Sequence, residues 1–121
     1  LGKPEEIVYA VQQGIDMFDC VIPTRHARHG QLFVFKNRDN LDLTGDFYET
    51  VNITNERFEH DLSVVDETYT DMPEFQYSKA YLRHLFKTDE MLGYRLATMH
   101  NVRFYLELMT LIRKHIEEGK L

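Results

Sequence analysis

The sequence predicts a single mixed α/β domain, and three observations lead to that prediction. The chain has 121 residues, which suffices for one modest hydrophobic core and falls well short of the roughly 200 residues of a complete (β/α)8 barrel. A short apolar run at 15–22 lies between Gly14 and Pro23, as a buried strand would. From Ser78 onward the apolar residues recur at helical spacing.

The first half of the chain predicts one helix and three strands. Pro4 suits the first turn of a helix because it lacks an N–H, and the two acids that follow suit the positive end of the helix dipole. Gly14 suits the left-handed residue that ends a helix. Strands are expected at 15–22, 31–35 and 51–58, and turns or loop at 37–50 and 59–76.

The second half predicts three helices. Ser78 can cap a helix through Leu82 and Leu85. Thr88, followed by two acids, is expected to open another. A last helix over about 101–118 carries a one-sided apolar stripe, and Gly119 stops it.

The charge is uneven and excludes several classes of protein. The net charge is −6, yet residues 39–74 hold eleven acids and a single base, while a basic run spans Arg25–Arg38. A polycation that coats nucleic acid is excluded at this net charge. One cysteine excludes a disulfide scaffold and a zinc site of four cysteines. No apolar run is long enough for a membrane span, and no signal peptide opens the chain, so we expect a cytoplasmic protein.

A carboxylate followed by arginines suggests chemistry on a substrate that carries phosphate. Asp19 lies near the carboxyl end of the predicted strand, the edge where βα architectures place catalytic groups. Thr24, Arg25 and Arg28 follow, and arginine's planar fork suits phosphate oxygens. Asp19 could be a nucleophile or a base. The spacing alone leaves a second interpretation open, in which Asp16 or Asp19 pairs with an arginine in the core.

The block from Gly14 to Gly30 reads Gly-Ile-Asp-Met-Phe-Asp-Cys-Val-Ile-Pro-Thr-Arg-His-Ala-Arg-His-Gly. It resembles the signature of the queuine/archaeosine tRNA-guanine transglycosylases, with the bacterial type nearest. Segments before and after the block resemble the same family in order; they are 2–8, 77–85, 92–93, 99–101 and 116–121. The resemblance covers nearly the whole chain.

The resemblance implies a fold larger than this chain. The family fold is a (β/α)8 (TIM) barrel with a small zinc-binding subdomain inserted near its C-terminus. Residues 1–121 would be the C-terminal part of that domain, which the first residue, Leu1 rather than Met, also suggests. Residues 1–30 would form the last barrel segment, 31–77 the inserted subdomain and 78–121 the closing helices.

The resemblance also implies an activity. The family consists of pentosyltransferases that exchange guanine at the tRNA wobble position for a 7-deazaguanine base. Asp19 matches the nucleophile, which attacks the ribose C1′ and forms a covalent intermediate, as in retaining glycosidases. Thr24, Arg25 and Arg28 match the positions that grip the anticodon loop. The implied partners are the tRNA anticodon loop, the 7-deazaguanine base and further copies of the chain in a homo-oligomer.

The sequence departs from the family at its zinc site. The family uses a Cys-x-Cys-x-x-Cys cluster and a histidine that matches His100. The cluster falls at Thr68–Glu74, which holds no cysteine. Asp71, Glu74 and His100 would offer zinc only a weak site without its preferred sulfur ligands. We therefore expect no metal cofactor, and we expect aromatic residues to stabilise the subdomain instead.

A second departure concerns catalysis. The residues that read guanine and the second catalytic aspartate of the family lie in earlier barrel strands. A lone barrel strand at 15–22 would leave its edges unpaired. We expect the isolated chain to be inactive and to need the N-terminal barrel portion or a second subunit. It would then be half of a split enzyme, an excised domain or a degenerate copy, and the alternative function is a non-catalytic module for RNA binding or dimerisation.

Overall fold

The computed structural model describes residues 1–36, 38–69 and 72–121, and for Glu74 the backbone alone. The chain forms two helices, then a hairpin of two strands, then two further helices. These elements are α1 (Pro4–Gln12), α2 (Ile22–Arg28), β1 (Gln31–Phe35), β2 (Tyr48–Asn52), α3 (Lys79–Lys87) and α4 (Met91–Glu117). Short 3-10 turns lie at Arg38–Asn40, Glu56–Phe58, Glu67–Tyr69 and Pro73–Phe75. This mixture of helices and a small sheet agrees with the α/β prediction in its coarse form.

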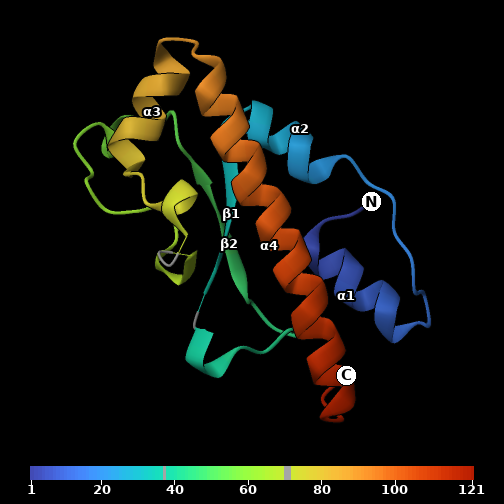
Figure 1. Ribbon diagram of the computed structural model, residues 1–121. Helices are drawn as coiled ribbons and strands as arrows, with labels where there is room; N and C mark the ends of the chain where they lie inside the picture. The colour runs from blue at the N-terminus through green and yellow to red at the C-terminus, as the bar shows by residue number, and fades with distance from the viewer. Residues whose placement is uncertain (37, 70–71) are drawn as a thin grey trace.

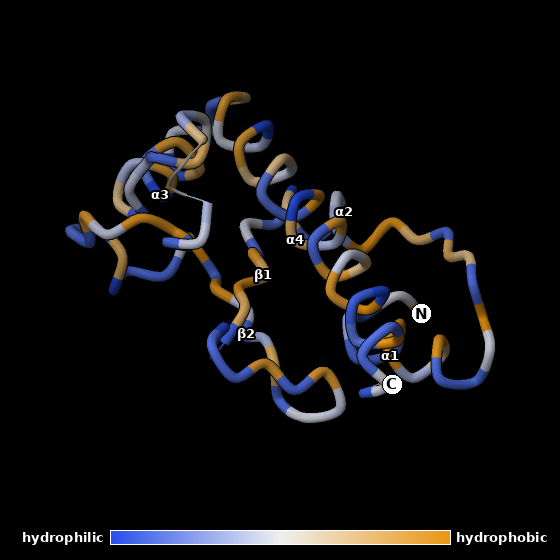
Figure 2. The backbone as a smooth tube through the Cα atoms, turned by 60° about the horizontal axis from the view of Figure 1, so that its bottom comes forward, coloured by the Kyte–Doolittle hydropathy of each residue, from blue (hydrophilic) through white to orange (hydrophobic). Residues whose placement is uncertain are grey.

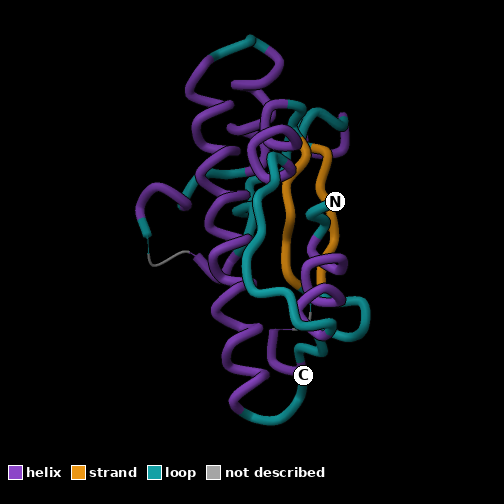
Figure 3. The backbone as a smooth tube through the Cα atoms, turned by 90° about the vertical axis from the view of Figure 1, so that its right-hand side faces the viewer, coloured by secondary structure: helices purple, strands orange, loops and turns teal. Residues whose placement is uncertain are grey.

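The long helix α4 is the element against which the others pack (Figure 1). The antiparallel hairpin of β1 and β2 runs alongside it (Figure 3), with Phe33 opposite Thr50. Both faces of β1 are buried. Phe33 and Phe35 enter a cluster with α1 and α4, and Leu32 enters a second cluster with α3.

Helix α1, strand β1 and helix α3 confirm three predictions. Pro4 opens α1, and Gly14 follows it with a φ of 96°. The side chain of Ser78 accepts a hydrogen bond from the Tyr81 N–H and caps α3. The strand predicted at 51–58 has the wrong bounds, because it ends at Asn52 and Asn55 then caps a 3-10 turn.

The helices predicted to begin at Thr88 and near Asn101 are instead one helix of 27 residues. Thr88 ends α3, since its hydroxyl donates to the His84 carbonyl, and Asp89 turns the chain with a φ of 57°. No proline interrupts α4, whose middle carries the buried polar residues His100 and Asn101. Because these two residues are polar, they interrupt the apolar pattern in the sequence, and the single long helix looks like two shorter ones. No helix within the described ranges is long and apolar enough to cross a membrane.

His100 and Asn101 bind the edge of β1 that faces away from β2. Asn101 Oδ1 accepts from the Phe33 N–H at 3.1 Å, and its Nδ2 donates to the carbonyls of Gln31 at 2.9 Å and Pro23 at 3.0 Å. His100 Nε2 donates to the Phe33 carbonyl at 2.7 Å. A free strand edge would leave these backbone groups unsatisfied in the core. The two side chains therefore substitute for a third strand and also fix the start of α2.

Asn101→Asp tests the importance of this contact. The change keeps the size of the side chain and removes the donor for two buried carbonyls, so it should cost about 2–4 kcal/mol of unfolding free energy. Asn52→Asp, which makes the same change of charge at an exposed position, should cost less than about 0.5 kcal/mol. Urea unfolding of both variants measures the difference. Equal losses would contradict the proposed importance of the contact.

Candidate functional site

The predicted barrel strand is present as an extended segment without a strand partner. Residues 15–21 have no regular secondary structure. Within the described part of the chain, no backbone group of residues 16–20 forms a hydrogen bond to another backbone group. The prediction of a buried strand at 15–22 is therefore wrong for this chain, because a strand needs a neighbour for its N–H and C=O groups.

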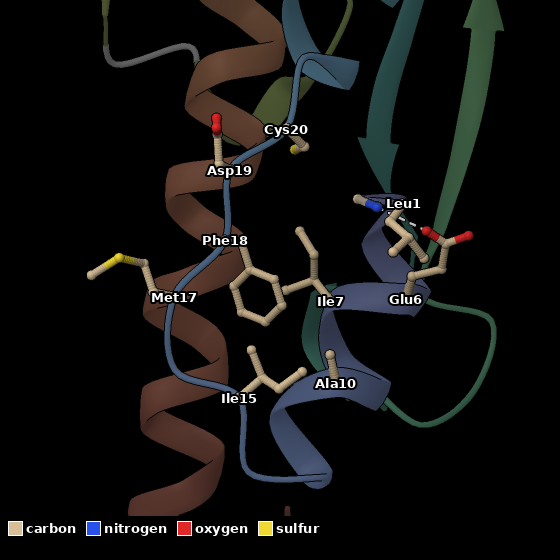
Figure 4. A pocket seen from close by; sticks show the side chains of 10 residues that line it. Leu1, Glu6, Ile7, Ala10, Ile15, Met17, Phe18, Asp19 and Cys20 are labelled. Atoms are coloured by element: carbon tan, nitrogen blue, oxygen red, sulfur yellow. Dashed lines mark hydrogen bonds between the residues drawn. The ribbon is translucent and has the colours of Figure 1, made fainter.

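The side chains of this segment nevertheless point to two sides. Figure 4 shows Phe18 pointing toward Ile7 of α1, Met17 pointing the opposite way and Asp19 pointing away from Ile7. Ile15, at the start of the segment, points toward α1 as Phe18 does. Phe18 and Cys20 pack on the core that α1 shares with α4. Met17 is 87% exposed, and Ile15 and Val21 are each 49% exposed. Figure 2 shows this segment at the outside of the molecule, with hydrophobic and hydrophilic residues following one another along it. Exposed apolar residues on an unpaired extended segment are typical of a strand that lacks a neighbour.

Hollows on both sides of the segment show the same incomplete packing. One, of about 250 Å³, is lined mainly by apolar side chains, including Ile7, Ala10 and Phe18. The other, of about 340 Å³, lies toward Tyr105 and Met109. Asp19 borders both and is exposed. Neither Asp16 nor Asp19 has an ion-pair or hydrogen-bond partner among the described residues, so the alternative that either pairs with an arginine in the core is wrong for this structure.

Thr24, Arg25 and Arg28 come together on helix α2, which begins three residues after Asp19. The Thr24 hydroxyl donates to the Val21 carbonyl at 3.1 Å and holds the first turn of the helix. Arg25 and Arg28 are three residues apart and therefore neighbours on the helix surface. Both are exposed, and neither guanidinium forms an ion pair within the described residues. Their charges are available to an anionic partner.

The two histidines of α2 and its C-cap have structural contacts of their own. The ring of His26 stacks on Phe33 at a centroid distance of 5.6 Å. Burial, aided by the Arg25 charge, lowers the pKa of His26, so this ring adds no charge at pH 7. His29 Nδ1 lies 2.8 Å from the Arg25 carbonyl and caps the end of the helix. Arg25 and Arg28 are the permanent charges of the site.

The weak site that Asp71, Glu74 and His100 could offer a metal can be described only in part. Asp71 and the side chain of Glu74 lie outside the described residues. His100 is buried in the middle of α4, with the aromatic rings of Tyr69 and Phe75 beside it. Across the described ranges, no three histidine, cysteine, aspartate or glutamate side chains gather as metal ligands would.

Asn101 supports the site, and its chemistry in the sequence does not indicate this role. Asn101 appears in the sequence only as part of a resembling segment, yet it bonds the Pro23 carbonyl and so holds α2 against β1. A polar residue in the middle of a helix suggests a buried hydrogen bond. Its partners, 70 and 78 residues away, are beyond any local pattern.

The site thus combines an exposed carboxylate on an unpaired segment with two unpaired arginines on the helix that follows. A comparison of the chain with models of protein families gives a match to the model described as queuine tRNA-ribosyltransferase. The match spans residues 1–121, and it includes both the Asp19 segment and α2. The chain belongs to the queuine tRNA-ribosyltransferase family.

Proposed function

We propose that this chain supplies the nucleophile and the anticodon-loop grip of a tRNA-guanine transglycosylase. Family membership supports a transferase of queuosine modification that acts on tRNA and a base. The observation that carries the finer proposal is the placement of Asp19 three residues before α2, whose Arg25 and Arg28 lack partners within the described chain. The carboxylate and the cations are then close enough in sequence to act on one nucleotide and its neighbouring phosphate.

In the proposed reaction an Asp19 carboxylate oxygen attacks the ribose C1′ of the wobble nucleotide. The bond from C1′ to guanine breaks, and a glycosyl ester on Asp19 holds the ribose. The incoming 7-deazaguanine base then attacks C1′ and releases the carboxylate. Two successive displacements at C1′ retain the configuration, as in retaining glycosidases.

The proposed grip follows from the charge and shape of α2. Arg25 and Arg28 can each present a planar fork to phosphate oxygens of the anticodon loop. Thr24 lies on the same side of the helix as Arg28, because residues four apart share a face. The acidic surface of 39–74 keeps this attraction local, so the chain would bind one loop without coating RNA in general.

Catalysis by this route needs further strands beside the 15–21 segment. Within the described chain the backbone of residues 16–20 is unbonded, and this, with the exposed Ile15, Met17 and Val21, supports a position beside further strands. We propose that an N-terminal barrel portion or a second subunit supplies them, and that the chain alone is inactive. Residues 1–30 would then complete a (β/α)8 barrel, with 31–77 and 78–121 as the inserted subdomain and closing helices.

A second candidate function is a non-catalytic module that binds RNA or mediates dimerisation. The observation that favours it is the exposed position of Asp19, with no second carboxylate paired to it in the described residues. In this alternative α2 still binds the anticodon loop, but no barrel partner restores base exchange.

Asp19→Asn separates the two functions. In a complex with a barrel portion of the same family, it should reduce exchange of labelled guanine by several orders of magnitude, because the amide is a poor nucleophile. Its affinity for tRNA should stay within about twofold, since Asp19 makes no proposed phosphate contact. Asp16→Asn, on the same exposed segment, serves as the matched control and should keep most of the exchange activity. No exchange by the wild-type complex with any barrel portion would favour the non-catalytic module.

Arg25→Gln and Arg28→Gln test the proposed grip. Each should weaken binding to an anticodon stem-loop RNA and lower the slope of log affinity against log salt by about 0.7, the value for one single-strand phosphate contact. Arg95→Gln removes an exposed charge of α4 and controls for the net charge. Fluorescence anisotropy at several salt concentrations gives the slopes. Identical slopes for all three variants would refute a local grip on α2.

A further inference from the structure

The centre of the structure holds a closed cluster where the family resemblance puts a metal. We define the aromatic–histidine cluster as Tyr69, Phe75, His100 and Arg103. The rings of Tyr69 and Phe75 meet His100 edge to face, at 6.0 and 6.5 Å between centroids, and each other at 5.6 Å. Tyr69 and His100 are each 1% exposed and Phe75 is 5% exposed. Aromatic rings at these distances and angles attract one another and exclude water.

The ring of His100 is oriented by one hydrogen bond to the backbone. Nε2 lies 2.7 Å from the Phe33 carbonyl oxygen. A carbonyl oxygen only accepts, so Nε2 carries the proton and Nδ1 keeps its lone pair. Histidines that bind metals commonly donate their other ring N–H in this way, so the orientation of His100 alone does not exclude zinc. Whether zinc fits therefore depends on the other ligands.

The oxygen atoms around the cluster do not replace the missing thiolates. Two buried atoms, Tyr69 Oη and Asp66 Oδ2, have no hydrogen-bond partner among the described residues. A phenol and a single carboxylate oxygen lack the sulfur that zinc prefers in structural sites. The guanidinium of Arg103 lies 5.2 Å from the centre of the Tyr69 ring and would repel a divalent cation. The residues that the structure describes therefore do not fit zinc.

The cluster makes the connection that a structural metal makes. A zinc site here would join the 69–74 segment to α4 through His100. Arg103 of α4 instead contacts Tyr69 and Met72, with its guanidinium over the Tyr69 ring and Nη1 3.0 Å from the Met72 sulfur. The contacts of the His100 ring with Tyr69 and Phe75 add a second link from the same helix. Tyr69, Met72 and Phe75 are thus held to α4 by packing and a cation–π contact.

We propose that the aromatic–histidine cluster replaces the structural zinc, so that this chain folds and stays folded without a metal. A structural zinc contributes folding free energy because its ligands come together only in the folded state. Here the two parts that it would join are already in contact through buried rings. The proposal concerns stability and does not depend on Asp19 or on the proposed reaction.

Metal content and thermal unfolding of the untagged chain test the proposal. Mass spectrometry of the purified protein should find less than about 0.1 equivalent of zinc, against the single ion of a structural site. The melting temperature should be the same with and without EDTA, and added Zn²⁺ should not raise it. A stoichiometric metal ion, or a clear fall of the melting temperature in EDTA, would overturn the proposal.

The melting temperature of the variant Tyr69→Phe provides a second test. The change removes a hydroxyl that has no partner among the described residues, so the melting temperature should stay the same or rise. Tyr105→Phe is the matched control, because its buried hydroxyl donates to the Gly2 carbonyl at 2.7 Å. That control should lower the melting temperature by about 4 °C, the effect of one lost hydrogen bond. A loss in Tyr69→Phe as large as in the control would mean that Tyr69 Oη holds a ligand, and the closed cluster would be refuted.

Discussion

The structure depends on the pairing of β1 with two polar side chains of α4. A two-stranded sheet has two free edges, and one edge of β1 lies in the core. There the Asn101 amide accepts from the Phe33 N–H, and the His100 ring donates to the Phe33 carbonyl. The same amide donates to the carbonyls of Gln31 and Pro23. Without these bonds, burying the aromatic face of β1 would also bury unsatisfied backbone groups, which would offset much of the gain. The hydrophobic clusters on both faces of β1 therefore require this polar contact.

The same requirement explains why the segment before α2 differs from β1. Residues 15–21 carry the apolar residues of a strand, but within the described chain only the two ends of the segment, Ile15 and Val21, form backbone hydrogen bonds, and no side chain or strand bonds the backbone of 16–20. Hydrophobic packing of Phe18 and Cys20 holds the segment near α1 and leaves its outer edge exposed. Apolar pattern alone is thus insufficient for a strand, since the N–H and C=O groups need partners.

This distinction also decides what could be predicted from the sequence. Local signals were sufficient for α1 and α3, because Pro4 and the Ser78 cap act on their own helices. They failed for α4, where His100 and Asn101 interrupt the apolar stripe for the sake of partners about 70 residues earlier. For the site, the spacing placed Asp19 beside the arginines of α2, and the resemblance to the family supplied a role for each. The exposure of Asp19 could not be predicted from the sequence. The apolar pattern of 15–22 indicates a strand between other strands, and whether such strands cover Asp19 does not depend on this pattern.

The proposed grip and the proposed nucleophile consequently differ in how firmly the described chain holds them. Helix α2 is anchored through the Pro23 carbonyl to Asn101 and through Ala27 to the core, so the positions of Arg25 and Arg28 are determined within this chain. Asp19 lies on the segment whose backbone is unbonded, so its orientation depends on whatever covers that segment. If the proposed function is right, RNA affinity is a property of the chain and base exchange is a property of the assembly. The proposed metal-free cluster at His100 fits this division, because its contacts lie in the anchored part and include none of the residues of the Asp19 segment.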